Sequence, residues 1–307
     1  MLPWSQYCVE AATVMLALAL LSTILVLAVG RTGVRAPAAA TIARARLSGG
    51  VLVAEKSAPV GSAPLEGNRG LAAYGSWLTR GSLVALTVAL VLRAVVTGHG
   101  PFANQYEFAV AFGWGIVAAY AYFEYRYQVR ALGLLVQPIA TALLLYAMTV
   151  GAKADPLVPA LQNNLLLTVH VALAIVAYGA FCVACAAGAL FLLSPPQGRR
   201  GLPSPERLDE IAYRAVVIAF PLMTLVIILG AVWAQIAWGT YWSWDPKETA
   251  SLFTWLIYGA YLHARVVRGW RGRRAAWLLM LGFAAVLFTF FGNLFFGGLH
   301  SYSGVAK

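Results

Sequence analysis

Long runs of apolar residues, separated by short polar segments, make up most of this chain. Eight runs reach roughly the 20 residues that a helix needs to cross a bilayer. They lie at roughly 9–30, 74–97, 107–124, 131–151, 165–193, 214–237, 250–267 and 275–297. Backbone amides in hydrocarbon must find internal partners, so unbroken runs of this length predict helices. The pattern therefore predicts an all-α, polytopic membrane helix bundle of about eight transmembrane helices.

The composition supports a membrane protein. Of the 307 residues, 61% are hydrophobic and 11% are charged, whereas soluble domains contain about 45–50% and about 25%. Such a composition excludes disorder and a coiled coil, and it disfavours a water-soluble globule. The chain has 3 cysteines, too few for a disulfide framework. Cys182 and Cys185 lie within an apolar run, where close helix packing explains them better than thiol exchange.

The basic residues indicate an orientation. The net charge is +11, and most Lys and Arg residues lie in the segments that follow odd-numbered runs. Cationic loops remain in the cytoplasm, so both termini are expected on the extracytoplasmic side. The basic charge thus reports topology beside the lipid bilayer and does not indicate a nucleic-acid partner.

The expected organisation changes at about residue 90. Residues 1–90 hold the N-terminal spans and a cytoplasmic linker at 32–70 that is rich in Ala, Gly, Pro and Arg. Residues 91–307 carry every histidine and form the expected functional core, with an outer loop at 238–248.

The four histidines are the first candidates for chemistry. His99 and His300 fall in outer loops, and His170 lies about 9 Å below the outer end of its helix. His263 lies about 20 Å from the outer end, in the cytoplasmic half. A single intramembrane histidine is explained equally well as a neutral residue bonded between helices. Three histidines near one face favour a site for haem iron, since neutral imidazole is a common ligand.

The outer loop 238–248 is unusually aromatic. Its aromatic residues are Trp238, Tyr241, Trp242 and Trp244. An interfacial belt needs one or two such residues per helix end, so a dense run favours stacking on a planar ring. Asp245, followed by Pro246 and with Glu248 three residues on, predicts an N-cap and a capping box. Capping alone also explains both acidic residues.

Trp238, Gly239, Trp242, Trp244 and Asp245 match the WGxxWxWD signature of haem-handling proteins in cytochrome c assembly. Three further segments support this resemblance. Residues 99–107 resemble an HxPxxNxYE outer loop, residues 299–302 resemble a C-terminal GLHSY element, and 263–265 resemble the histidine tract of the following span. From about residue 90 onward, the chain resembles the CcsA (or ResC) type of System II cytochrome c synthase.

The resemblance implies a function and its partners. It implies haem lyase activity together with a partner: a holocytochrome c synthase subunit that presents haem b for thioether attachment to the CxxCH motif of apocytochrome c. His170 and His300 match its catalytic, axial iron ligands, beside Trp238, Trp242, Trp244 and Asp245. His263 matches a deeper iron ligand, whose second ligand would come from a CcsB/ResB-type membrane subunit. A thiol reductant pathway is a further expected partner.

Two outer residues are weaker candidates for binding the cofactor. His99 lies at a similar depth and competes for an axial place, although loop packing with Asn104 and Tyr106 explains it as well. Arg93, like Lys247, is an outward cation that could pair with a haem propionate. Interfacial anchoring accounts for both cations equally.

Two other functions stay open. A haem exporter of the CcmC type, which hands haem to a chaperone, would be shorter and would lack the His99 and His300 segments. A membrane b-type cytochrome would need paired histidines at one depth, whereas His170 and His263 differ by about 11 Å. The expected location is a bacterial plasma membrane, and the resemblance also allows a thylakoid membrane.

Overall fold

The computed structural model describes residues 1–32, 69–154, 165–195, 202–292 and 295–301. The linker expected at 32–70 lies outside the described residues except at its two ends, so its structure stays a prediction. The division of the chain at residue 90 likewise stays a prediction.

The described residues form helices and contain no strand, which confirms the all-α prediction. A short 3-10 helix, η2 (Arg130–Leu132), precedes α4. The α-helices are α1 (Leu2–Thr32), α2 (Arg69–Thr97), α3 (Gln105–Tyr127), α4 (Gly133–Val150), α5 (Leu165–Leu193), α6 (Pro205–Trp238), α7 (Pro246–Val267) and α8 (Arg273–Phe291).

Six of these helices, α1, α2, α4, α5, α6 and α8, are long and apolar enough to cross a membrane. Helices α3 and α7 fall short of that measure because both mix apolar residues with tyrosine, tryptophan and charged residues. The polytopic helical class is therefore confirmed. The full count of eight crossings and the extracytoplasmic position of the termini stay predictions.

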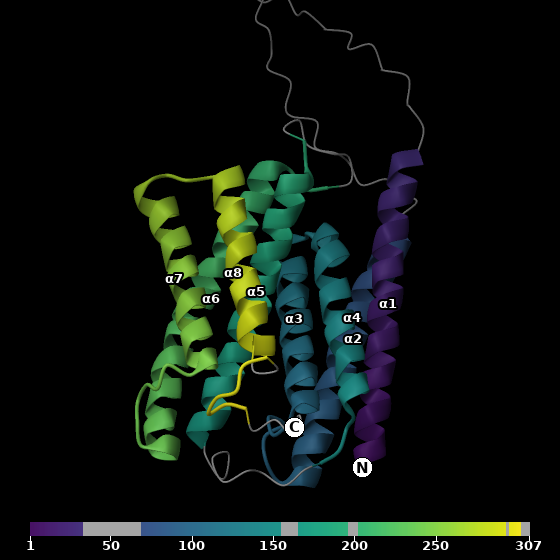
Figure 1. Ribbon diagram of the computed structural model, residues 1–307. Helices are drawn as coiled ribbons and strands as arrows, with labels where there is room; N and C mark the ends of the chain where they lie inside the picture. Colours follow the sequence, from purple (N-terminus) through teal and green to yellow (C-terminus); the bar gives the residue numbers. More distant parts are fainter. Residues whose placement is uncertain (33–68, 155–164, 196–201, 293–294, 302–307) are drawn as a thin grey trace, which may run out of the picture.

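Helix α5 forms the centre of the bundle, packing against α6, α3 and α8, while α1 and α2 pair on one side (Figure 1). The α3–α5 contact depends on two glycines. A Cβ on Gly179 would collide with the backbone carbonyl of Gly115, so only glycine allows the two helices to approach this closely. Small residues of this kind are typical of helix contacts in membranes.

Hydrogen bonds of Asp209 link α6 to α7 and to the residue before α8, at the end of the bundle where α7 turns into α8. Asp209 of α6 accepts hydrogen bonds from Arg265 at 2.9 and 2.7 Å and from the backbone N–H of Gly272 at 3.2 Å. Cys182 and Cys185 are free thiols in the middle of α5, and Cys185 contacts Met280 of α8. This placement agrees with a packing role.

The opposite end of the bundle gathers the segments that the sequence singled out. The end of α8 lies there, at the same end as the start of α1 (Figure 1). The expected helix through residue 297 stops at Phe291, and residues 295–301 form turns. Gly292, Gly297 and Gly298 follow the apolar run, and glycine favours a turn over a continued helix. This turn carries His300 back over the bundle.

Candidate functional site

A pocket with an empty volume of about 1020 Å³, partly open to solvent, lies at this end between α3, α5, α6, α7 and the segment after α8. Both His170 and His300 line it, although they come from distant parts of the sequence. Lys247 and Glu248 are its charged residues. Its aromatic walls include Phe102, Phe108, Phe112, Tyr178, Trp233, Tyr241, Trp242 and Phe290.

His170 is fixed by helix α6. Its Nδ1 lies 2.8 Å from the carbonyl oxygen of Val226, which can only accept, so Nδ1 carries the hydrogen. The lone pair of Nε2 is then available to a ligand. One turn beyond Val226, a Cβ at Gly230 would lie 2.7 Å from Cε1 of the imidazole. Glycine at this position therefore makes room for the ring.

His300 is fixed by the start of helix α7. Its Nδ1 lies 2.8 Å from Oδ1 of Asp245, and its backbone N–H donates to Oδ2 at 3.4 Å. An ionised carboxylate only accepts, so His300 also carries its hydrogen on Nδ1 and keeps Nε2 as the acceptor. Burial lowers the pKa of His300 below 6.5 and outweighs the opposing effect of Asp245. The imidazole is therefore neutral at pH 7.

Asp245 combines two tasks. It is the N-cap of α7, accepting from the N–H of Lys247 at 2.9 Å, and Glu248 completes the capping box, as the sequence predicted. Burial alone would raise the pKa of Asp245, but the hydrogen bond and charge of His300 lower it to about 2. Asp245 also contacts Gly298, where a Cβ would collide with its carboxylate.

The tryptophans of the outer loop occupy different environments. The ring of Trp238 lies edge-on to His300, with 4.8 Å between centroids, and Trp242 lines the pocket. Trp244 is 69% exposed and is not among the residues that line the pocket. It reaches the site only through Trp242, at 5.8 Å between ring centroids.

Several residues of the pocket were missed by the sequence reasoning. Trp233 of α6 lies 6.0 Å from the His300 ring, but it falls inside an apolar run that gives no sign of its role. Lys247, by contrast, was named from the sequence, and its side-chain nitrogen lies 5.2 Å from the centroid of the Phe108 ring. Among the described residues, two buried atoms of the lining have no hydrogen-bond partner, Nε1 of Trp233 and Oε1 of Glu248. The pocket thus offers a cation and an unused donor to a ligand.

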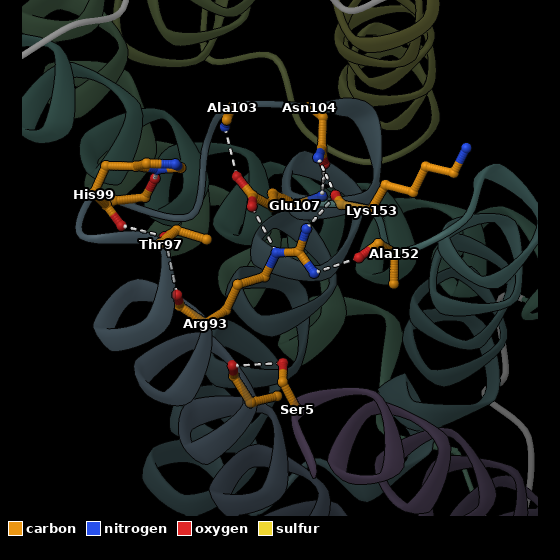
Figure 2. A network of polar contacts seen from close by, with 11 residues as sticks. Ser5, Arg93, Thr97, His99, Ala103, Asn104, Glu107, Ala152 and Lys153 are labelled. Atoms are coloured by element: carbon orange, nitrogen blue, oxygen red, sulfur yellow. Dashed lines mark hydrogen bonds and ion pairs between the residues drawn. The ribbon is translucent and has the colours of Figure 1, made fainter. Parts of the chain in front are cut away.

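Arg93 does not line the pocket, contrary to the expectation that it could pair with a propionate. It is 1% exposed and donates to Glu107 at 2.6 Å and to the carbonyls of Ala152 at 3.0 Å and Lys153 at 2.6 Å (Figure 2). Its guanidinium also lies 4.8 Å from the centroid of the Tyr106 ring. The group is fully engaged within the chain, so its role is to hold α2, α3 and the segment after α4 together.

His99 lies at the edge of the same network (Figure 2). Its Nδ1 lies 2.8 Å from the carbonyl oxygen of Gly100, and its own carbonyl accepts from Thr97 at 3.3 Å. Asn104 caps α3 by accepting from the N–H of Glu107 and donates to the Lys153 carbonyl at 2.9 Å. His99 is not among the pocket residues, so the structure gives it no axial position.

His263 lies outside the pocket, on an exposed face of α7. The structure therefore separates it from His170, as the depth argument expected. Its role in a deeper site stays a prediction, because any second ligand from a partner would belong to another chain.

The geometry is suited to a flat metal complex. Two imidazoles with fixed tautomers line one aromatic pocket, and in each the hydrogen bond that orients the ring is made by Nδ1. Apolar walls favour a large planar ring, and Lys247 favours a carboxylate. No cluster of three or more metal-ligating side chains occurs within the described ranges.

Comparisons with known proteins agree on one family. Residues 102–300 match the cytochrome c assembly protein family. A cytochrome c biogenesis protein CcsA from Guillardia theta is 36% identical over 258 residues, covering 75% of this chain and 84% of that protein. The CcsA protein from Gloeobacter violaceus is 35% identical over 283 residues, covering 72% and 83% respectively.

One solved structure has a similar fold. The cytochrome c heme lyase CcmF superposes with a TM-score of 0.61 at 20% identity, covering 94% of this chain. This chain spans about half of that protein, 46% of its length. The similarity concerns the fold.

Proposed function

The chain belongs to the cytochrome c assembly protein family, among the CcsA-type biogenesis proteins, and on that premise we propose that it is the haem-handling subunit of a cytochrome c synthase. Its role would be to present haem b between His170 and His300 for attachment to the CxxCH motif of apocytochrome c. The site would lie on the extracytoplasmic side of a bacterial plasma membrane or a thylakoid membrane.

One observation carries the proposal: His170 and His300 line the same pocket, and each has its Nδ1 engaged by an acceptor of the protein. An acceptor bonded to Nδ1 fixes the ring and raises the basicity of the other nitrogen. Two such imidazoles are suited to hold an iron porphyrin from both faces.

The rest of the pocket supports a porphyrin as substrate. Phe108, Phe112 and Trp242 supply apolar and aromatic walls for the ring. Lys247 is the cation nearest to these walls and would pair with a propionate, the task expected of it from the sequence. The buried Nε1 of Trp233 is a second donor that a carboxylate could satisfy.

Attachment would add the two cysteine thiols of the apocytochrome across the two vinyl groups. Each addition breaks an S–H bond, forms a C–S bond and transfers the hydrogen to the other vinyl carbon, with no net oxidation. The protein would contribute mainly by holding the vinyl groups where the thiols arrive. The histidine of CxxCH would then replace one axial histidine, which favours release.

The proposal includes partners. A CcsB/ResB-type membrane subunit would complete the synthase and supply the second ligand to a deeper haem at His263. A thiol reductant pathway would deliver the apocytochrome with both cysteines reduced. The exposed position of His263 on α7 is compatible with such a contact.

The test is the absorption spectrum of the purified complex with each histidine replaced. His170→Gly and His300→Gly should each abolish the low-spin spectrum of the pocket haem and the synthase activity, and added imidazole should restore part of both. His99→Gly is the matched control and should leave the spectrum unchanged. Unchanged haem content in the double variant would refute the proposal. Haem loading without thioether formation, in the presence of the partner, would instead favour a haem-delivery protein.

A further inference from the structure

A second cavity lies in the bundle between α3, α4, α5 and α8. Its empty volume is about 800 Å³, and every residue that lines it is apolar or aromatic. Its walls include Ile116 of α3, Leu143 of α4 and Val286 of α8. Because no charged side chain lines it, the cavity favours an apolar occupant over water or ions.

This cavity adjoins the histidine pocket through a single layer of rings. Phe112, Tyr178 and Phe290 line both cavities. The Phe112 ring stacks on Tyr178 at 5.4 Å between centroids and meets Phe290 edge-on at 5.3 Å. These three side chains therefore lie between the two spaces, and rotation of their rings would widen a connection there.

The cavity faces the side of the bundle. Helix α3 lies between α4 and α8 in Figure 1, and α4 and α8 are not among the described helix pairs that pack along their length. Leu287 is 42% exposed on one wall, and Ala142 is exposed on the other. Tyr146 and Phe291 meet edge-on at 5.5 Å between centroids, where the two helices end. The opening between α4 and α8 thus faces hydrocarbon.

The depth of the opening matches the pocket. Its residues on α8 span 283–291, the last turns before the segment that carries His300. Its residues on α4 span 139–146, in the middle of that helix. The opening therefore extends from the middle of the bundle toward the end that contains the histidine pocket, on the side of one leaflet of the membrane.

We infer that this cavity, the lateral groove, is the access site through which haem passes from that leaflet into the histidine pocket. The inference rests on the proposed function. Haem dissolved in a leaflet keeps its ring among the acyl chains and its carboxylates at the headgroups, and the groove offers an apolar slot at that depth. A lipid acyl chain could also fill the groove, but it has no group for the histidines that lie beyond the shared aromatic rings to bind.

The test is the rate at which the purified full-length protein, reconstituted in phosphatidylcholine vesicles, takes up haem added to the bilayer. Ala142→Trp and, on the opposite wall, Leu287→Trp fill the groove from separate helices. Each should slow the appearance of the low-spin spectrum by about tenfold or more, because haem must then displace a bulky ring. Final occupancy and the shape of the spectrum should match those of the wild type.

Val88→Trp is the matched control, since Val88 is 42% exposed on α2, whose residues do not line the groove. It should take up haem at the wild-type rate. Wild-type rates in both groove variants would overturn the inference and leave a lipid chain as the occupant. The proposed function fails by a different result, namely the absence of a histidine-dependent low-spin spectrum in the wild-type protein itself.

Discussion

The imidazole of His300 is paired with the carboxylate of Asp245, with 2.8 Å between Nδ1 and Oδ1. The pair joins the segment after α8 to the start of α7, because Asp245 is also the N-cap of that helix. One carboxylate thus positions the proposed iron ligand and starts a helix. The tryptophan-rich loop ends at this residue, so the loop, the helix and the histidine are held in one arrangement.

Replacing Asp245 by Asn should weaken haem binding without unfolding α7. Asn is as good an N-cap as Asp, so the helix start is retained. The loss of charge beside His300 should lower the affinity for haem by about 10- to 100-fold, as for other residues that accept a hydrogen bond from a metal-binding histidine. A haem titration followed by absorbance measures the change, and circular dichroism checks the helix content. Unaltered affinity would show that the pair is structural only.

Haem loading should depend on pH through His300. Protonation adds a hydrogen to Nε2, the nitrogen offered to iron, and burial holds the pKa of His300 below its ordinary value of 6.5. Protonation of His300 should therefore leave loading unaffected above pH 6.5 and lower it only below that pH. Asp245 raises the pKa of His300, so Asp245→Asn should move the decline to still lower pH. A decline centred above 6.5 would contradict this electrostatic account.

Gly230→Ala should displace the His170 ring. A Cβ at Gly230 would lie 2.7 Å from Cε1 of the imidazole, closer than two carbons can pack. The collision should cost about 1–3 kcal/mol or turn the ring out of position, with loss of the low-spin spectrum. Gly259→Ala on α7 is the matched control, since its Cβ would meet Phe220 at an ordinary 3.5 Å. Equal haem spectra in the two variants would count against the placement of His170.

Lys247 and Arg93 should respond differently to removal of their charge. Lys247→Met should lower haem affinity by about 10- to 150-fold, the equivalent of about 1.5–3 kcal/mol for a charge-assisted hydrogen bond. The variant should also lose any preference for haem over its dimethyl ester, because the ester has no carboxylate to pair. Titrations with both porphyrins measure this directly.

Arg93→Met should instead reduce stability. Removing one partner of a buried ion pair leaves Glu107 uncompensated and costs about 3–5 kcal/mol. The unfolding midpoint in denaturant should fall, while the folded protein keeps its preference for haem over the dimethyl ester. If the Arg93→Met variant no longer preferred haem over the dimethyl ester, Arg93 would have to be a propionate partner after all.

The sequence alone predicted much of the fold. The length of the apolar runs predicted the helices, since backbone amides in hydrocarbon leave few other structures. Asp245, Pro246 and Glu248 predicted the start of α7 and its capping box, because capping is a local interaction between neighbours in the chain. The end of α8 was predicted too late, because the residues after Phe291 remain apolar although they turn.

The candidate site was predicted only in part. His170, His300, Trp238 and Trp242 could be named from the sequence because each belongs to a recognisable pattern. Arg93 was misplaced because charge alone does not tell which carboxylate and carbonyls a guanidinium will meet. Trp233 and the lateral groove could not be found, since an apolar residue looks the same in a sequence whether it lines a cavity or contacts lipid.

The amino-acid sequence by itself determined which segments are helical, where α7 begins and which residue types could bind iron, because these depend on composition and on neighbours within a few residues. Only the tertiary structure decided that His170 and His300 share a pocket, that Val226 and Asp245 orient their rings, and that Arg93 turns away. Those relationships join residues far apart in the chain, and only the packing of the helices brings them together.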